Sequence, residues 1–538
     1  MTSIPSLQNQ DTVEYGFPEK TNFDALDRMT PLPVQELFRQ WLLTPHREYI
    51  PESWDQYFYE GWHLGAHPQT HVCRLHCSEG HFIGWIFQPQ LYLREGQAVF
   101  PEEMINLPVR GQPSSQDVER ILFGRTATGT SMSEEGFEGM WIGVIFGRDG
   151  KKPFRRVYPG PTHSVLFSPS AEVVATSHNL IPDAARDIEI SRAFDLPARQ
   201  RFYSFGLTAF KGVQRLLPNH YLDLDSFNAV RHWPTHPFEQ FEHGATGAER
   251  IVEHSRRLLW GLSKRYSSYK IFLSAGRDSR AIAAIARPLL HEDRFDFRLN
   301  TTYGSDLGSR VDLQASIQLA RIMRLPHDVT KRVIRKVPRL AILKGFVRIG
   351  EAVSGPSLAS AATSGQGAAF SGLNLAGMAG EAGRAFYWAG RDSDKPVGVE
   401  EVNKCVGAPV VESTVLAAER WLAELPAWLR DSPPDVFDLL YVEQRLGCWE
   451  APVRYLYTGT PHTASLMASG FNIETMLRLP YAYRKSGRLQ HDMIAHSWPE
   501  LLSVPFNEPR GFLRFVALQE RARNQLRALR RALRSAIR

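Results

Sequence analysis

The sequence predicts an α/β protein in which an antiparallel, sandwich-like part precedes a parallel-sheet part with a largely helical end. From about His71 to Asp225, short apolar runs are separated by turn residues, which is typical of antiparallel strands. From about Thr246 to Met323, helical and strand patterns alternate, which is typical of a parallel sheet. We place the boundary near residues 233–237, which divides the chain into domains 1–235 and 236–538.

The strand-like part follows residues 1–70, which are rich in proline and aromatic residues and have weak periodicity. Its apolar runs are short and bounded by turn residues, such as those at 147–150. They cover residues 81–87, 140–146, 155–158, 164–168 and 172–176. We therefore expect an antiparallel unit with a sandwich-like core.

The alternating part opens with a helix. Thr246 and Glu249 have the spacing of a capping box at its start. One face of this helix is apolar, with Ile251, Val252, Leu258, Leu259 and Leu262. The elements that follow are a strand at 269–273, a polar loop at 274–279, a helix starting at 281–286, a strand at 295–302 and a helix at 311–323. After about residue 330 the chain is predicted to be mainly helical.

The composition is that of an ordinary globular protein. Charged residues make up 22% of 538 and the net charge is +6, so we expect no nucleic-acid partner on this ground. No run reaches the roughly 18 apolar residues that a membrane span needs. Residues 1–18 lack the basic-then-apolar order of a secretory signal. The 4 cysteines are too few for a disulfide framework, so we expect a cytoplasmic protein.

Cys73 and Cys77 lie near His71 and His81, a group that allows a metal site. No second Cys/His pair follows at zinc-finger spacing. We therefore favour the simpler interpretation, in which the two cysteines are strand residues beside a turn.

The chain ends in a basic amphipathic helix from residue 515 to 538. Its apolar stripe consists of Phe515, Leu518, Ala522, Leu526, Leu529 and Leu533. We expect this helix to dock on its own domain with its arginines in water. A role toward a partner, RNA or a membrane surface is the alternative.

The loop from Ser274 to Ser279 carries the strongest chemical signal. A loop that joins a buried strand to a helix lies at the carboxyl edge of a parallel sheet, where ligands bind, and the helix N-terminus suits phosphate. Gly276 permits a close backbone approach. Asp278 is an acid placed where phosphate would lie, so it implies Mg²⁺ between the two. Arg277 and Arg280 could offset phosphate charge, and no Walker pattern is present.

Residues 271–279, I-F-L-S-A-G-R-D-S, resemble the S-G-G-x-D-S pyrophosphate loop of the asparagine-synthetase family of N-type ATP pyrophosphatases. Residues 205–222 are similar to the family's T-x-F-x-G-I-x-R-L-x-P-G-H-Y-L stretch, which closes its N-terminal domain. Residues 377–384, G-M-A-G-E-A-G-R, resemble a degenerate form of its S-G-E-G-x-D-E run. The three segments occur in the family's order, so together they are more specific than any one alone.

The resemblance implies an Ntn-like antiparallel β-sandwich domain, a degenerate glutaminase, followed by a parallel-sheet ATP-pyrophosphatase domain. It implies ATP and Mg²⁺, with Asp278 as the metal ligand. The ATP-binding residues carried over are Leu273, Ser274, Ala275, Gly276, Arg277, Asp278, Ser279 and Thr302. In this family a substrate carboxylate is adenylated, and an amine then displaces AMP to form an amide.

Glu381 matches the glutamate of the third motif, where it could accept a proton from the amine or position it. The simpler interpretation of Glu381 is a surface carboxylate in a glycine-rich loop. Arg384 stands where the family has an aspartate that binds a second metal ion, and Ala385 replaces a glutamate. Either Glu381 takes over metal binding, or metal binding is weakened, or Arg384 contacts the substrate or pyrophosphate. Glu381 and Arg384 are the predicted catalytic residues.

The nitrogen source follows from the first residues. Glutamine-using members carry a catalytic cysteine directly after the initiator Met1, whereas Thr2 follows here. Members with an inactive glutaminase domain include β-lactam synthetases and lasso-peptide cyclases, which use an amine already present in the substrate. Free ammonia is the alternative nitrogen source. The resemblance thus implies an ATP-dependent, AMP-forming carbon–nitrogen ligase or cyclase of natural-product biosynthesis. Its substrates would be small-molecule or peptide carboxylates and amines. The resemblance is also compatible with a precursor peptide and its leader-binding partner as the partners of this protein.

Two other functions are open at this point. The chain could be a catalytically inactive family member that acts as a binding or scaffold subunit in a peptide or polysaccharide pathway. Adenylation could also lead to thiolation or tRNA modification, which requires a cysteine near the loop. Cys405 and Cys448 are the candidates in that domain.

Overall fold

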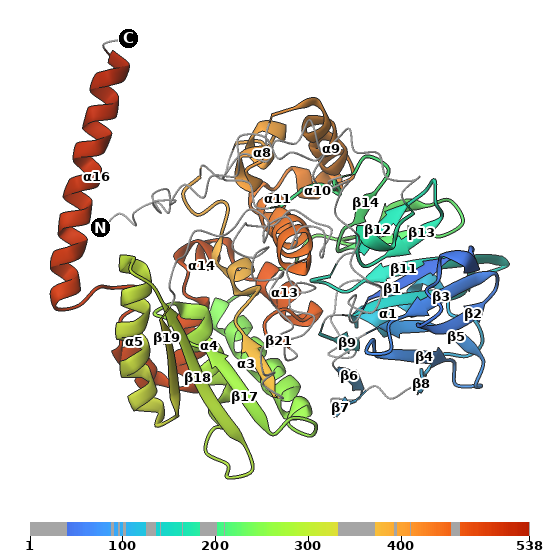
Figure 1. Cartoon of the computed structure of the whole chain (residues 1–538), viewed down its shortest axis with the longest axis horizontal. Helices are drawn as coiled ribbons and strands as arrows, with labels where there is room; N and C mark the ends of the chain where they lie inside the picture. The colour runs from blue at the N-terminus through green and yellow to red at the C-terminus, as the bar shows by residue number, and fades with distance from the viewer. Residues whose placement is uncertain are drawn as a thin grey trace.

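The computed structural model describes residues 40–536 apart from several internal gaps, at 88–90, 95–96, 101–103, 125–135, 140, 164, 183–201, 209, 332–371, 392–394, 409 and 453–462. Two large antiparallel sheets come first, together with a small antiparallel sheet of order β7-β6-β9, made of β6 (Leu91–Arg94), β7 (Gln97–Val99) and β9 (Gly136–Glu138). A parallel sheet follows, and helices make up most of the rest (Figure 1). This is the mixed α/β architecture that the sequence predicts.

The first antiparallel sheet has the strand order β14-β12-β13-β1-β3-β2, and the second has the order β16-β15-β11-β10-β5-β4-β8. In the first sheet the strands are β1 (Trp41–Thr44), β2 (Asp55–Tyr59), β3 (Trp62–Ala66), β12 (Val165–Ser168), β13 (Val173–Ala175) and β14 (Gln214–Leu216). In the second they are β4 (Val72–His76), β5 (Phe82–Phe87), β8 (Met104–Asn106), β10 (Ile142–Asp149), β11 (Lys152–Pro159), β15 (His220–Asp223) and β16 (Asn228–Arg231). Only the β4–β8 pair among these is parallel.

The two sheets pack face to face through a shared aromatic and aliphatic core. Trp41 of β1 stacks on Phe87 of β5 with ring centroids 4.5 Å apart, which joins one sheet to the other. The opposite face of the second sheet is covered by α1 (Ser115–Phe123), whose Val118, Ile121 and Leu122 are buried on it. The prediction of an antiparallel sandwich is confirmed, while β1–β3 fall in residues whose weak periodicity gave no strand signal.

Cys73 lies in β4 and Cys77 directly follows that strand, and both are buried beneath α1. This placement confirms the simpler of the two interpretations of the cysteine pair. Across the described residues no group of three or more His, Cys, Asp or Glu side chains is arranged to hold a metal ion.

The parallel sheet has the strand order β19-β18-β17-β20-β21. Its strands are β17 (Ser268–Phe272), β18 (Asp296–Tyr303), β19 (His327–Lys331), β20 (Leu373–Ala376) and β21 (Thr463–Ser465), and every neighbouring pair is parallel. The chain moves outward from β17 to β18 and β19 on one side, and β20 lies on the other side. The order therefore reverses between β17 and β20, where doubly wound sheets bind ligands beyond their carboxyl ends.

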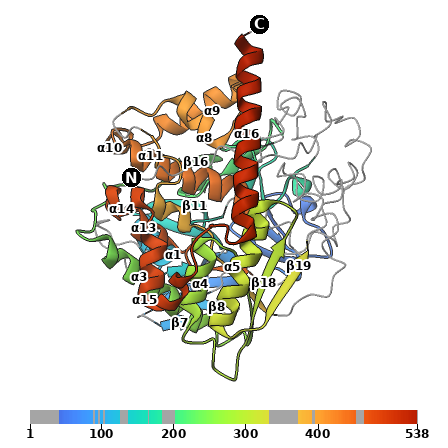
Figure 2. The ribbon, with the colours of Figure 1, turned by 90° about the vertical axis from the view of Figure 1, so that its left-hand side faces the viewer.

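Helices cover this sheet. Three of them pack around one another beside β17 and β20, namely α3 (Gly244–Leu262), α4 (Arg277–Ala286) and α15 (Leu489–Ser497), and α5 (Leu307–Met323) packs on β18 and β19 (Figure 2). The five apolar residues predicted on one face of α3 are all buried. The predicted capping box is wrong, because α3 begins at Gly244 after His243 and Thr246 lies inside it.

The remaining helices confirm the expectation of a mainly helical end. They are α8 (Val399–Val406), α9 (Glu412–Ala423), α10 (Ala427–Arg430), α11 (Pro433–Leu440), the π-helix η7 (Tyr441–Glu450), α13 (Gly470–Leu477), α14 (Tyr481–Ser486), and the short 3-10 helices η6 (Gly380–Arg384) and η8 (Pro499–Ser503). No described helix is long and apolar enough to cross a membrane.

The last helix, α16 (Phe512–Ala536), stands apart from the body of the molecule in Figure 1, and its C-terminal end extends beyond the body in Figure 2. Leu513 is buried at its start, but Phe515, Leu518 and Leu526 are exposed by 55%, 62% and 59%. The expectation that this helix docks on its own domain is therefore wrong for these three positions. Among the other elements, the helix contacts mainly α5.

Candidate active site

The loop after β17 is held in shape by its own side chains. The Ser274 and Ser279 hydroxyls lie 3.1 Å apart, and the Gly276 N–H donates to Ser274 Oγ at 3.1 Å. The Ala275 N–H donates to Asp312 Oδ1 of α5 at 2.8 Å. Helix α4 begins at Arg277 with Gly276 as its N-cap, so the positive end of its dipole faces the carboxyl edge of the sheet.

The second loop enters the same place from β20. Gly377 and Gly380 let it approach closely: a Cβ at Gly377 would lie 2.9 Å from the Asp278 carbonyl carbon, and one at Gly380 would lie 2.6 Å from Asp278 Oδ1. Both distances are far below van der Waals contact. The third predicted motif therefore needs these two glycines to reach the loop that follows β17.

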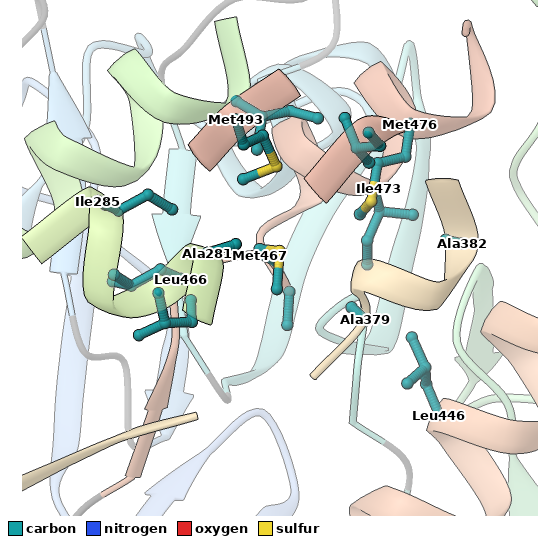
Figure 3. Packing of buried hydrophobic residues seen from close by; sticks show 14 of the residues in the cluster. Ala281, Ile285, Ala379, Ala382, Leu446, Leu466, Met467, Ile473, Met476 and Met493 are labelled. Atoms are coloured by element: carbon teal, nitrogen blue, oxygen red, sulfur yellow. The ribbon is translucent and has the colours of Figure 1, made fainter. Parts of the chain in front are cut away.

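The short helix η6 rests on a sulfur-rich apolar cluster. Figure 3 shows Ala379 and Ala382 beside Met467, Ile473 and Met476, with Ala281 and Ile285 of α4 nearby. Packing of this kind fixes both loops to one buried base, because interiors are close-packed.

Asp278 and Arg384, 106 residues apart in the chain, meet directly. Arg384 Nη2 donates to Asp278 Oδ2 at 3.1 Å and to Glu381 Oε1 at 3.0 Å. The other oxygen of Asp278 accepts from Gln490 Nε2 of α15 at 2.9 Å, and Gln490 also donates to the Gly380 carbonyl at 2.7 Å. One buried amide thus joins the two loops from beneath.

Glu381 is held on its far side by η7. Tyr441 donates its hydroxyl to Glu381 Oε2 at 2.9 Å, and Arg445 Nε lies 3.6 Å from the same oxygen. Tyr441 and Arg445 are four residues apart and contact the same carboxylate from one face of this wider helix. Helices of the π type occur often at functional sites.

Burial dominates the electrostatics of this group. It raises the pKa of Asp278, an effect that Arg384 opposes and the Glu381 carboxylate strengthens. Burial, and then Glu381, raises the pKa of Tyr441 far above its ordinary value, so this hydroxyl keeps its proton and acts as a donor. Burial, and then Arg384, lowers the pKa of Arg277. The side chains of Asp278, Glu381 and Arg384 are still 23%, 26% and 26% exposed, so a ligand can reach them.

The structure places the two loop arginines differently. Arg277 donates Nη1 to the Gly487 carbonyl at 2.7 Å, on the rim of the site. Arg280 is fully buried, and its guanidinium donates to backbone carbonyls of Ala275 and of the segment 501–505 and lies 4.1 Å from the Phe506 ring centre. The expectation that Arg280 offsets phosphate charge is therefore wrong, since it supports the loop from behind.

The predicted nucleoside residues are only partly brought together. Leu273 is buried, and its carbonyl accepts from Thr301 Oγ1 at 2.8 Å, which in turn lies 2.9 Å from His327 Nε2. Thr302 is exposed, because successive strand residues point to opposite faces of the sheet. The strand residue that contacts the end of β17 through its side chain is therefore Thr301, which was not among the predicted residues.

Four residues of this site were missed from the sequence: Gln490, Tyr441, Arg445 and Asp312. Gln490, Tyr441 and Arg445 lie on helices that follow all three recognised motifs, and Asp312 lies on α5, between the second and the third in chain order. None of the four belongs to a motif of its own. Of the four, Asp312 alone has a sequence position that indicates the site. It lies in α5, which follows β18, and β18 pairs with the strand that precedes the loop.

Comparisons with known proteins are sparse. No protein-family model matches the sequence, and no curated protein matches it. Among solved structures the chain is similar to glutamine-dependent NAD+ synthetase from Acinetobacter baumannii in complex with adenosine diphosphate, with 14% sequence identity and a TM-score of 0.18. The match covers 40% of this chain and 38% of that chain, so the similarity extends over well under half of that protein. A TM-score of this size carries no argument about fold or function.

Proposed function

We propose that the chain is an ATP-dependent, AMP-forming carbon–nitrogen ligase or cyclase that joins a carboxylate to an amine without using glutamine. One observation carries the proposal: the two loops that resemble the ATP-pyrophosphatase motifs converge at the switch point of a parallel sheet. Asp278 of the first loop touches both Arg384 and the amide that holds the second. We propose small-molecule or peptide carboxylates and amines as its substrates.

The residues then have the following roles. The first loop and the N-terminus of α4 bind the phosphates of ATP, since backbone N–H groups and a helix dipole favour anions. An oxygen of the substrate carboxylate attacks the α-phosphorus, the bond to the β-phosphate oxygen breaks, and pyrophosphate leaves. The amine nitrogen then attacks the acyl carbon, AMP leaves, and Glu381 accepts the proton that the nitrogen loses. Tyr441 and Arg384 hold Glu381 in place for this transfer.

The buried thiols support an amine rather than glutamine or thiol chemistry. Cys73 and Cys77 are buried beneath α1, on the face of the second sheet that points away from the first. Burial raises the pKa of both Cys405 and Cys448 to about 11, which disfavours the thiolate that nucleophilic attack requires. Among the described cysteines, none is placed as a nucleophile, so thiolation is the weaker outcome of adenylation here.

The test is ATP–pyrophosphate exchange across a panel of carboxylic acids and peptides, together with direct ATP binding by equilibrium dialysis. We expect the wild type to bind ATP and to exchange with at least one acid. Asp278→Asn should lower exchange by about 10²–10³-fold, because the carboxylate that positions the Arg384 guanidinium at the phosphates is lost. Thermal unfolding should change little, since the amide keeps the shape of the carboxyl group.

Asp296→Asn is the matched control. Asp296 begins β18, so it lies at the amino end of the same sheet and is exposed. It should exchange like the wild type. If the wild type neither binds ATP nor exchanges with any acid, the enzyme proposal fails. ATP binding without exchange would favour the binding or scaffold subunit, a function that the Arg384 ion pairs on both site carboxylates also favour.

A further inference from the structure

Two carboxylates share one guanidinium at the centre of the candidate site. The same nitrogen, Arg384 Nη2, lies 3.1 Å from Asp278 and 3.0 Å from Glu381. All four carboxylate oxygens are engaged, since Gln490 donates to the second oxygen of Asp278 and Tyr441 to that of Glu381. A pair of acids this close is normally neutralised by a cation, and here that cation is part of the chain.

This arrangement does not fit an Mg²⁺ ion held by the protein. Mg²⁺ requires oxygen ligands in near-ideal octahedral geometry at about 2.0–2.1 Å. The oxygens that would supply them accept N–H or O–H donors instead, and a second cation beside the guanidinium would be repelled. The prediction that Asp278 binds Mg²⁺ stays a prediction, but binding would first require Arg384 to leave.

We infer that Arg384 is a built-in cation that takes the place of a protein-held metal ion between Asp278 and Glu381, and that it binds an anionic phosphate group. The Arg384 side chain is 26% exposed and contacts both acids through Nη2, so the rest of its planar fork can donate to a ligand oxygen. A guanidinium presents its N–H donors in a planar fork, which matches the geometry of phosphate oxygens. This inference rests on the proposed function in one respect, namely that the phosphate group bound by Arg384 belongs to ATP.

The test measures Mn²⁺ binding without nucleotide, by the loss of the free Mn²⁺ electron paramagnetic resonance signal. We expect the wild type to bind essentially none. Arg384→Asp should gain a site for one Mn²⁺ per chain, with at least tenfold more bound metal than the wild type, because three carboxylates then converge. Adding Asp278→Asn to that variant should abolish the gain.

Arg321→Asp is the matched control, since Arg321 is exposed on α5 and the charge change is the same. It should bind no more Mn²⁺ than the wild type. Arg384→Gln covers the case in which the aspartate variant does not fold, and it should also gain metal, though less. Tight Mn²⁺ binding by the wild type that Asp278→Asn removes would overturn the inference. ATP binding is measured separately on the same wild-type sample. A wild type that binds neither ATP nor Mn²⁺ would contradict the proposed function but not the inference about Arg384.

A second inference comes from α16. Its exposed apolar residues Phe512, Phe515, Leu518 and Leu526 lie on a helix that carries seven arginines and one glutamate between residues 512 and 536. Apolar residues and arginines on one helix are the composition of segments that lie in the interface of an anionic lipid surface. Nearly uniform positive charge disfavours a second copy of the same helix as the partner, because like charges would face each other.

The geometry points to α16 as an interfacial helix that binds anionic membrane surfaces, independently of the candidate active site. The test is co-sedimentation of the full chain with vesicles of phosphatidylcholine containing about one-third phosphatidylserine, against vesicles of phosphatidylcholine alone. We expect at least tenfold stronger binding to the anionic vesicles, and a large loss at high salt because ions screen the attraction.

The double variant Phe515→Glu/Leu518→Glu should lose vesicle binding by at least tenfold. Val410→Glu is the matched control, since Val410 is also an exposed apolar residue but lies outside this helix. Equal binding by the double variant and the wild type would show that the apolar stripe plays no part. A wild type that ignores vesicles but forms dimers that the double variant lacks would assign the stripe to a second copy instead.

Discussion

Arg484→Met is expected to destabilise the protein by about 3–5 kcal/mol at pH 8, the cost of leaving buried charges without their partner. Arg484 is 0% exposed on α14 and pairs with both Asp435 and Asp438 of α11, at 3.4 Å for the former. The aspartates are themselves buried, and their other oxygens accept from Trp388, Ser432 and Tyr481. Methionine keeps an unbranched apolar stem like that of arginine but supplies no charge.

The loss should depend on pH. Burial raises the pKa of Asp438 to about 7 despite the opposing effect of Arg484, and removing the arginine raises it further. A raised carboxyl pKa means that the folded state favours the protonated form of Asp438. The loss of folding stability caused by ionising this buried carboxyl therefore grows as pH rises above the ordinary aspartate pKa, and it becomes smaller as pH falls. We therefore expect the difference in unfolding free energy between variant and wild type to shrink between pH 8 and pH 5.

Urea unfolding at both pH values measures this effect. Arg488→Met is the control, because Arg488 lies four residues later, is 64% exposed and pairs with Asp492 at the surface. It should change stability by no more than about 0.5 kcal/mol. A loss below about 1 kcal/mol for Arg484→Met at pH 8, or one that is the same at pH 5, would contradict the argument.

Local patterns in the sequence were enough to predict the strand–loop–helix unit of the candidate site. The apolar residues before Ser274 indicate a buried strand, and the small residues after Ser279 indicate a helix, each within a few residues. The structure has β17 and α4 there. The position of Asp278 next to the third motif was predictable only through the resemblance. No local pattern reports that β20 pairs with β17 rather than with β19, since pairing is a property of the whole sheet.

The residues that contact Asp278 and Glu381 from other helices could not be predicted from the sequence. The patterns of those helices are dominated by the apolar residues that pack in the core, and they do not mark the polar residues that reach the site. Gln490 stands in α15 among buried Leu489, Met493 and Ile494, where a glutamine has no special pattern. Tyr441 and Arg445 lie in a π-helix, whose period differs from the 3.6 residues on which helical patterns rest. For Arg384 the sequence leaves three alternatives open, because contacts between residues that are far apart in the chain depend on the three-dimensional fold.

The π-helix η7 also connects the candidate site to the sandwich. Tyr441 and Arg445 contact Glu381, whereas the neighbouring Glu443 and Gln444 contact the N-terminal sheets. Glu443 is 0% exposed and accepts from Arg231 at 2.5 and 2.9 Å, from Asn219 at 3.0 Å and from Trp421 at 2.7 Å. Gln444 Oε1 accepts from the Phe205 N–H at 2.6 Å. The sandwich thus holds the helix whose other face positions Glu381.

Glu443→Ala is expected to cost about 3–5 kcal/mol of stability, because Arg231 is left buried without its partner. It should also loosen η7, seen as faster amide hydrogen exchange over residues 441–450, and lower any adenylation-dependent ligation through Glu381. Glu424→Ala is the control: Glu424 also reaches the sandwich, through His220 at 3.3 Å, but is 39% exposed, so about 1 kcal/mol or less is expected.

Acid titration separates the ion pair from packing. Burial alone would raise the pKa of Glu443, but Arg231 and its hydrogen bonds lower it below the ordinary value. The stability that this lowering supplies is therefore complete above the ordinary glutamate pKa of about 4.3 and is lost as pH falls through the lower folded value. The wild type should lose stability below about pH 4 more steeply than Glu443→Ala, and the two curves should converge in acid. Parallel curves would mean that the carboxylate contributes packing only, and that the sandwich holds η7 through Gln444 and the apolar contacts.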